Sequence, residues 1–280
     1  MPHFADNAMF APLAVIDNYR IAKDTMCLRV AAPSTMCAAH PGQFFMLRDL
    51  RSTDPLIGRA FALYDCDPQS GWLEVAYLVK GKLTQSISRL SNGSTVGMCG
   101  PLGNSFDDSS VEHLIMVAGG IGQTPFLCLS KEATGKQKFG ERNSAYAGRV
   151  SLCYGARTKE YLAGVENFQK AGATVHIATE DGSIGPPQRV TNVLELLLKD
   201  EPDLAKTRVV CCGPEPMMEA VAKIAETFQV PCQVSLETPM ACGIGICFTC
   251  VAKVGCINDW DYQRTCVEGP IFEAGEIVWH

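Results

Sequence analysis

The segment LIMVAGGIGQTPF, residues 114–126, decides the fold class of this chain. Its apolar start predicts a strand buried on both faces, and Gly119, Gly120 and Gly122 predict a tight turn. Pro125 suits the first turn of a helix, where no backbone N–H is needed. A strand, a glycine turn and a helix start in this order indicate one unit of an α/β domain. The turn would also let a pyrophosphate approach the backbone, although it is not the G-x-G-x-x-G fingerprint, and a turn without a ligand is the alternative.

The same alternation continues toward the C-terminus. Apolar runs at 150–154, 174–178 and 208–212 predict further buried strands, with helical patterns between them, and together they predict a parallel α/β sheet. The last run leads into the turn CCGPEPM, which contains Cys212 and Gly213. Ligands of open parallel sheets bind at the carboxyl ends of the strands, so we expect both turns to border one cleft. A core cysteine is the simpler interpretation of Cys212 alone.

The chain before this segment has the pattern of an all-β domain. WLEVAYLV, residues 72–79, alternates with period two, and short apolar runs are separated by Pro- and Gly-containing turns. A small barrel or sandwich is predicted. Arg59 is a candidate bidentate partner for a diphosphate, and Thr84 is a candidate cap for a helix over 85–90. The simpler interpretations are an exposed charge and an ordinary cap.

Four of the fourteen cysteines are spaced as metal ligands. ACGIGICFTC places Cys242, Cys247 and Cys250 at C-x4-C-x2-C, and Cys266 follows after fifteen intervening residues. This is the spacing of a plant-type [2Fe–2S] cluster, which would also staple a C-terminal segment that has little room for an apolar core. Structural zinc and a disulfide pair are the alternatives, and Cys256 is a rival fourth ligand.

Composition narrows the remaining classes. The 280 residues carry a formal charge of −6 without a basic cluster, so nucleic acid is not an expected partner. The N-terminus has no basic start followed by an apolar run, which argues against a secretory signal. The uncharged stretch 114–130 approaches the length of a membrane span, but the glycines in its middle argue against one. We therefore expect a cytoplasmic protein with reduced cysteines.

In this order, the motifs resemble the ferredoxin–NADP reductase superfamily. The most specific stretch is SLETPMACGIGICFTC followed by RTCVEGPIF, and VAGGIGQTP, CGPEPM and GPLGNSF add to it. The resemblance covers nearly the whole chain and is closest to the electron-transfer subunits of class 1B dihydroorotate dehydrogenases. It implies a six-stranded antiparallel β-barrel that binds FAD (1–108), a parallel-sheet α/β domain that binds NAD(H) (109–231) and a small [2Fe–2S] module (232–280).

The resemblance also implies site residues. The flavin motif of the family falls on Arg59, Ala60, Phe61, Ala62, Ala76, Tyr77, Leu78, Leu83 and Thr84, and the cluster ligands fall on Cys242, Cys247, Cys250 and Cys266. The chain departs from the family pattern at Ala60 and Ala62, where Pro and Ser are usual, and at Leu83, where a glycine is common. Ala62 lacks a hydroxyl that could bond the flavin. The gap before Cys266 is about one residue longer than is usual in the family.

The implied function is an electron relay between NAD(H), FAD and the cluster. Its partner would be an FMN-containing catalytic subunit that oxidises dihydroorotate in pyrimidine biosynthesis, in a heterotetramer with two copies of each chain. The cofactors carry this chemistry, so no side chain is expected to act as a catalytic acid or base. A reductase subunit of a hydrogenase, a sulfide dehydrogenase or a ferredoxin system is one alternative, and a non-catalytic binding module with structural zinc is another. Arg157 after the strand 150–154 is a candidate contact for a 2′-phosphate, although the resemblance favours NAD.

Overall fold

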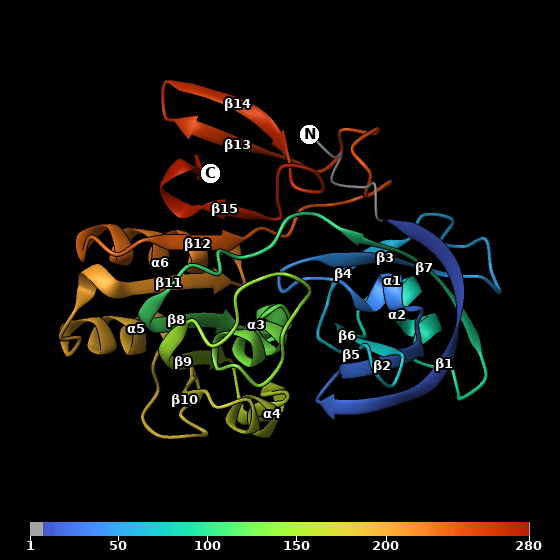
Figure 1. Cartoon of the computed structure of the whole chain (residues 1–280), viewed down its shortest axis with the longest axis horizontal. Coiled ribbons are helices and arrows are strands. Elements are labelled where there is room, and N and C mark those ends of the chain that lie inside the picture. The colour runs from blue at the N-terminus through green and yellow to red at the C-terminus, as the bar shows by residue number, and fades with distance from the viewer. Residues whose placement is uncertain (1–7, 280) are drawn as a thin grey trace.

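The computed structural model describes residues 8–279, which form two large units and a small third one (Figure 1). An antiparallel β unit comes first, an α/β unit follows, and a two-stranded module lies across one end of both. This order of fold types confirms the expectation from the sequence. The expected start of the first domain at residue 1, and the first seven residues of the segment without a signal pattern, lie outside the described residues. No helix within residues 8–279 combines the length and apolar character that crossing a bilayer requires.

Seven strands form the first sheet, in the order β4-β3-β7-β1-β2-β6-β5, and all neighbours are antiparallel. They are β1 (Met9–Ala22), β2 (Thr25–Ala31), β3 (Phe44–Asp49), β4 (Arg59–Ala62), β5 (Asp65–Asp67), β6 (Trp72–Leu78) and β7 (Thr95–Leu102), with the short helices α1 (Ser34–Cys37) and α2 (Lys82–Ile87). The alternation in WLEVAYLV puts Leu73, Val75, Tyr77 and Val79 on one face of a strand. The first three lie in the core of this unit, and Val79, just beyond the end of β6, is half-buried against it. The period-two pattern therefore located β6 and its buried face.

The expected closed barrel of six strands is a curled sheet of seven in the described residues. The two edge strands, β4 and β5, are separated in the chain by only Leu63 and Tyr64. The Leu63 N–H donates to the carbonyl of Gln43 (2.9 Å) at one edge, and the Tyr64 N–H donates to the carbonyl of Glu74 (2.9 Å) at the other. One continuous segment thus crosses from edge to edge, and it changes its hydrogen-bonding partner at Leu63 and Tyr64.

The second sheet has the order β10-β9-β8-β11-β12-β15. Its strands are β8 (Val111–Gly119), β9 (Ala147–Ala156), β10 (Thr174–Thr179), β11 (Thr207–Cys212), β12 (Cys232–Ser235) and β15 (Ile271–Glu273). Five are parallel, but β15 runs antiparallel to β12, so the sheet is mixed and the expectation of a wholly parallel one is corrected. The reason is that the chain returns from the C-terminal module and adds an edge strand to the sheet it left.

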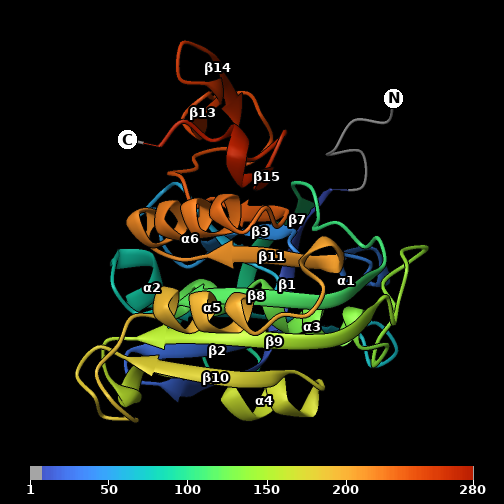
Figure 2. The ribbon, with the colours of Figure 1, turned by 90° about the vertical axis from the view of Figure 1, so that its left-hand side faces the viewer.

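Helices cover both faces of this sheet (Figure 2). They are α3 (Phe126–Ala133) and α4 (Val165–Lys170) on the face toward the β unit, and α5 (Val190–Lys199) and α6 (Glu215–Thr227) on the other, with short 3₁₀ turns at Gly120–Gln123, Lys159–Tyr161, Leu204–Lys206 and Ala274–Glu276. Phe126 and Phe168 share one core with Tyr64 of the β unit. Helices α3 and α4 therefore form the layer that joins the two large units.

The C-terminal module is an insertion between two neighbouring strands. The chain leaves the sheet after β12, forms the hairpin of β13 (Val251–Cys256) and β14 (Asp259–Arg264), and returns as β15. The expected boundary after residue 231 therefore falls within this sheet, because Cys232–Ser235 pair with β11. The short strand was not expected from the sequence, since four residues give too little pattern to read.

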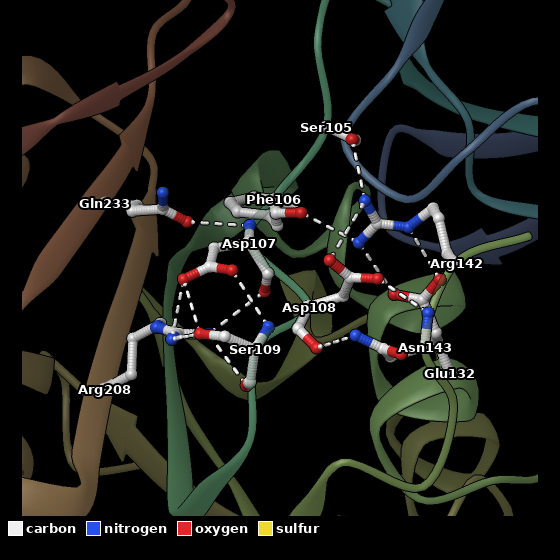
Figure 3. Close-up of polar contacts among 10 residues, drawn as sticks. All are labelled: Ser105, Phe106, Asp107, Asp108, Ser109, Glu132, Arg142, Asn143, Arg208 and Gln233. Carbon is white, nitrogen blue, oxygen red and sulfur yellow. Dashed lines mark hydrogen bonds and ion pairs between the residues drawn. The ribbon is translucent and has the colours of Figure 1, made fainter.

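The linker between the two large units is held on one side by Arg142 (Figure 3). The guanidinium forms a bidentate ion pair with Glu132, with Nε and Nη2 at 2.8 and 3.0 Å from its two oxygens. It also donates to the carbonyl of Phe106 (2.8 Å) and to the hydroxyl of Ser105 (2.9 Å). The Glu132 side chain has no exposed surface. One arginine thus neutralises a buried carboxylate and fixes the path of the linker.

Arg208 of β11 holds the same linker from the other side. Its Nη2 lies 2.7 Å from the Asp107 carboxylate and also contacts the hydroxyl of Ser109, and its Nη1 donates to the Asp107 carbonyl (3.1 Å). The side-chain oxygen of Gln233 accepts a hydrogen bond from the Asp107 N–H (3.1 Å). Figure 3 shows the linker running between the two arginines, so its conformation is fixed by both.

Arg142→Met should lower the free energy of unfolding by about 3 kcal/mol, because it leaves the buried Glu132 carboxylate without its cation. Urea unfolding of the cofactor-loaded protein measures this change. Lys23→Met removes the exposed pair with Glu160 and should leave the stability nearly unchanged. Equal losses in the two variants would show that burial of the Arg142 pair has no special weight.

Candidate cofactor sites

The two glycine turns expected at the carboxyl ends of the strands touch each other. A Cβ placed on Gly122 would lie 2.3 Å from the carbonyl oxygen of Cys212, and one placed on Gly213 would lie 3.0 Å from the amide nitrogen of Gly119. The first distance is far inside van der Waals contact, so only glycine fits at position 122, and the second is tighter than ordinary contact. Gly120 has φ of 57°, and nothing lies within 4 Å of its Cβ position. The structure therefore brings all five expected residues of the nucleotide site together, with one open glycine.

Cys212 forms part of the wall between these turns. Burial raises the pKa of its thiol to about 12, so it is a neutral group near pH 7. We therefore interpret Cys212 as a packing residue beside the nucleotide site, which is the simpler alternative left open by the sequence.

Two polar side chains near this edge were not singled out by the sequence. Gln123, in the turn itself, is fully buried, and neither of its amide atoms has a hydrogen-bond partner within residues 8–279. The hydroxyl of Thr158, just after β9, is buried and unpaired in the same range. Buried polar groups are normally hydrogen-bonded, so both side chains mark positions where the described residues leave hydrogen-bonding groups without a partner. The neighbouring Arg157, the candidate 2′-phosphate contact, is exposed.

The expected flavin residues come from strands that are not adjacent in the sheet. Phe61 of β4 and Tyr77 of β6 meet edge to face, with ring centroids 5.9 Å apart. Their neighbours Ala60, Ala62 and Leu78 are half-buried and Ala76 is buried. Arg59 is exposed, and its Nη1 donates to the carbonyls of Ile57 (3.0 Å) and Gly58 (2.9 Å). The structure therefore joins the two aromatic parts of the motif and leaves the arginine accessible.

The helix that carries Thr84 begins earlier than expected. It runs over Lys82–Ile87, with Gly81 as its N-cap, so Thr84 is not the cap of a helix over 85–90. Its hydroxyl instead accepts hydrogen bonds from the N–H groups of Lys80 (2.9 Å) and Gly81 (3.0 Å) and so fixes the turn before the helix. Leu83 is buried in the core of the β unit, and there only its backbone is free to meet a ligand.

The end of this helix is anchored by a buried carboxylate. Asp49 of β3 accepts two hydrogen bonds from the Arg51 guanidinium, at 3.0 and 2.9 Å, and one from the hydroxyl of Ser86. Its side chain is almost fully buried, and the Arg51 guanidinium holds its pKa well below the usual range. The carboxylate therefore stays charged and ties α2 to the sheet.

The four expected cluster cysteines form two pairs. Cys250 and Cys266 are buried with their sulfurs 3.1 Å apart, and the exposed Cys247 lies within hydrogen-bonding reach of the half-buried Cys242. Hydrogen bonding to Thr249 lowers the pKa of Cys247 to about 6, and burial raises that of Cys266 to about 12. Within residues 8–279 no three Cys, His, Asp or Glu side chains have the arrangement that holds a single ion.

Two thiol pairs fit a group with two metal ions, since a [2Fe–2S] cluster takes four thiolates shared between its two irons. Gly243 and Gly245 have φ of 73° and 78°, and the N–H of Ile244 points at the Cys242 sulfur (3.5 Å). The glycines therefore allow the loop to turn its amides toward sulfur. Cys256 is exposed at the end of the hairpin strand, paired with Asp259, and is not part of the two pairs.

Three successive segments of the chain match models of known protein families. Residues 12–106 match the oxidoreductase FAD-binding domain, residues 116–223 match the oxidoreductase NAD-binding domain, and residues 237–278 match the iron–sulfur cluster binding domain of dihydroorotate dehydrogenase B. The electron transfer subunit of dihydroorotate dehydrogenase B (NAD(+)) from Caldanaerobacter subterraneus is 33% identical over 86% of this chain and 87% of its own. That from Bacillus caldolyticus is 34% identical over 95% and 97%.

This chain belongs to the family of dihydroorotate dehydrogenase B electron transfer subunits. It is an oxidoreductase with FAD-, NAD- and iron–sulfur-binding domains. A solved NADH-dependent reduced ferredoxin-NADP oxidoreductase, from work on flavin-based electron bifurcation, is 27% identical, with a TM-score of 0.81 over 96% of this chain and 90% of that one. The ferredoxin reductase of carbazole 1,9a-dioxygenase, 18% identical, has a TM-score of 0.65 over 81% and 69%, and shows the shared fold.

Gly122→Ala should weaken NADH binding about tenfold or more, because the added methyl overlaps the Cys212 carbonyl and pushes the two turns apart. Fluorescence titration of the FAD-loaded protein with NADH measures the affinity. Gly275→Ala is the matched control, since nothing lies within 4 Å of its Cβ position. Unchanged affinity in Gly122→Ala would contradict a nucleotide site at these turns.

Cys266→Ser should abolish the [2Fe–2S] cluster, whereas Cys256→Ser should retain it, because only Cys266 pairs with another expected ligand. Iron and acid-labile sulfide per chain, together with the visible spectrum, provide the measurement. Loss of the cluster in Cys256→Ser with retention in Cys266→Ser would reverse the assignment of the fourth ligand.

Proposed function

We propose that this chain passes electrons between NAD(H), FAD and a [2Fe–2S] cluster, and exchanges them with an FMN-containing dihydroorotate dehydrogenase catalytic subunit. The observation that carries the proposal is the two thiol pairs on a module that rests against the β unit beside its expected flavin strand. When bound, the FAD and the cluster supply the conversion between paired and single electrons. The family of the chain supports the choice of partner.

The residues of the chain have binding and orienting roles in this proposal. Gly119, Gly120, Gly122 and Gly213 let the nucleotide approach the backbone, and the 3₁₀ turn at Gly120–Gln123 presents N–H groups to its phosphates. Arg59 and the turn held by Thr84 bind the FAD diphosphate, and Phe61 and Tyr77 hold the flavin with Ala60, Ala62, Ala76, Leu78 and the backbone of Leu83. Cys242, Cys247, Cys250 and Cys266 hold the cluster. No side chain transfers a proton to substrate.

We propose a heterotetramer with two copies of each chain, acting in pyrimidine biosynthesis in the cytoplasm, with NAD as the nucleotide. Three domains share the relay: a β unit for FAD, an α/β unit for NAD(H) and a cluster module inserted in the latter. The names of the curated relatives, which specify NAD(+) and an electron transfer subunit, support the choice of NAD and of a catalytic partner subunit.

A ferredoxin-linked reductase is the second candidate function. The observation that favours it is the TM-score of 0.81 to an NADH-dependent reduced ferredoxin-NADP oxidoreductase, with coverage of 96% of this chain. Since the domains are shared, the two functions differ in what docks at the cluster and not in how electrons reach it.

The partner can be tested by purification from the native source. We expect an FMN-containing polypeptide to co-purify, and the complex, but not the isolated chain, to reduce NAD+ with dihydroorotate. Reduction of the chain by ferredoxin, without any dihydroorotate-dependent activity in the complex, would instead favour the second candidate. A colourless protein containing zinc would exclude both.

A further inference from the structure

The cluster module meets the β unit through one small apolar cluster, which we call the interdomain contact. Its buried members are Phe44, Met46, Leu102, Cys250 and Cys266, and its half-buried members include Ala60, Cys99, Met240, Ile244 and Val267. Two of the four expected ligand cysteines therefore belong to the same packed group as side chains of β3, β4 and β7. The cluster loop and the flavin unit are in direct van der Waals contact.

The register of β3 and β4 decides which residues face this contact. Phe44 pairs with Ala62 and Met46 pairs with Ala60, whereas the alternate pair, Phe45 and Phe61, packs toward the interior of the β unit. Side chains of directly opposed residues share one face of a sheet. The outer face of the expected flavin strand is therefore the face that the cluster module covers, and Met46 stands beside Ala60 on it.

Met46 also supports the cluster loop. A Cβ placed on Gly243 would lie 2.6 Å from Cγ of Met46 and 3.1 Å from its sulfur. Gly243 directly follows Cys242, the first expected ligand, and its φ of 73° turns the loop at this point. The glycine is thus required both by the backbone and by the closeness of the methionine. Met46 touches the loop one residue from a ligand and pairs across the sheet with the flavin strand.

We propose that Met46 is a positioning residue that sets the separation between the bound flavin and the cluster, and thereby the rate of electron transfer between them. The proposal rests on the proposed flavin and cluster sites. Tunnelling between two cofactors weakens exponentially with distance, so a small shift of the loop changes this step strongly. Methionine suits the position because its unbranched, adaptable side chain fills the irregular space between the strand and the loop. The hydride step at the nucleotide turns does not depend on this contact.

Met46→Ala should slow reduction of the cluster by NADH about tenfold, because the loop loses its support and the geometry between the two cofactors relaxes. Stopped-flow absorption follows flavin reduction, and rapid-freeze EPR follows the reduced cluster. Flavin reduction should keep its wild-type rate, and Met46→Leu, which conserves volume, should restore cluster reduction to within about threefold. A redox titration of the cluster followed by EPR separates slower transfer from a changed driving force.

Met98→Ala is the matched control, because Met98 is fully buried in the core of the same β unit and is not a member of the interdomain contact. It should lower stability without slowing cluster reduction. An unchanged rate in Met46→Ala, or equal slowing in the two variants, would overturn the proposal. If Met46→Ala fails to hold the cluster, Met46→Val removes less volume and provides the same comparison. Failure of the proposed function would look different, since wild-type protein would then show no cluster reduction by NADH.

Discussion

The ion pair between Arg142 and Glu132 is the contact on which the arrangement of the units depends. A carboxylate without exposed surface needs a cation, and the remaining N–H groups of that cation need acceptors. The linker supplies these acceptors through the Phe106 carbonyl and the Ser105 hydroxyl. The interactions that neutralise the buried Glu132 carboxylate are therefore the same ones that fix the linker, and the linker in turn fixes how the two large units meet.

The linker extends this constraint to the cluster module. Asn104, at its start, donates from its side chain to the carbonyls of Glu268 (3.0 Å) and Ile271 (2.8 Å), and its side-chain oxygen accepts from the Ile271 N–H (2.9 Å). Arg208 holds the middle of the same segment to β11. One stretch of chain thus contacts the layer beneath the nucleotide turns, the sheet and the return from the module. The linker therefore connects the α/β unit to the return strand of the cluster module.

The features that could be predicted from the sequence are those set by residues close together in the chain. Gly119 and Gly122 mark a turn because neighbouring atoms leave no room for a side chain there, and Gly120 because its backbone is left-handed; the spacing of the four cysteines is a property of the loop itself. The contact between the two turns followed from the topology of a parallel sheet. These parts of the site depend on residues near one another in the chain or on one general rule.

The rest could not be predicted because it depends on partners far apart in the sequence. Nothing local distinguishes Arg142 and Arg208 from surface arginines, since the linker groups that they bind lie far away in the sequence, 36 residues for the Phe106 carbonyl and 101 for the Asp107 carbonyl. The crossing at Leu63 and Tyr64 depends on hydrogen bonds to Gln43 and Glu74, whose positions are set by the whole sheet. Thr84 was misplaced for a simpler reason: Gly81 is the cap, and a threonine at the third helical position bonds the same turn from within.

The insertion of the cluster module between two strands has a physical consequence for its role. A domain attached by one linker can reorient, whereas this module is fixed at both ends, because β12 and β15 pair with each other. Its buried thiol pair, Cys250 and Cys266, belongs to the contact with the β unit, while Cys247 is exposed. An electron carrier that exchanges electrons with a bound flavin needs a fixed distance to it, and one that also serves a partner protein needs an accessible side. The attachment of the module through both β12 and β15 provides the fixed distance, and the pair of thiols that includes the exposed Cys247 provides the accessible side.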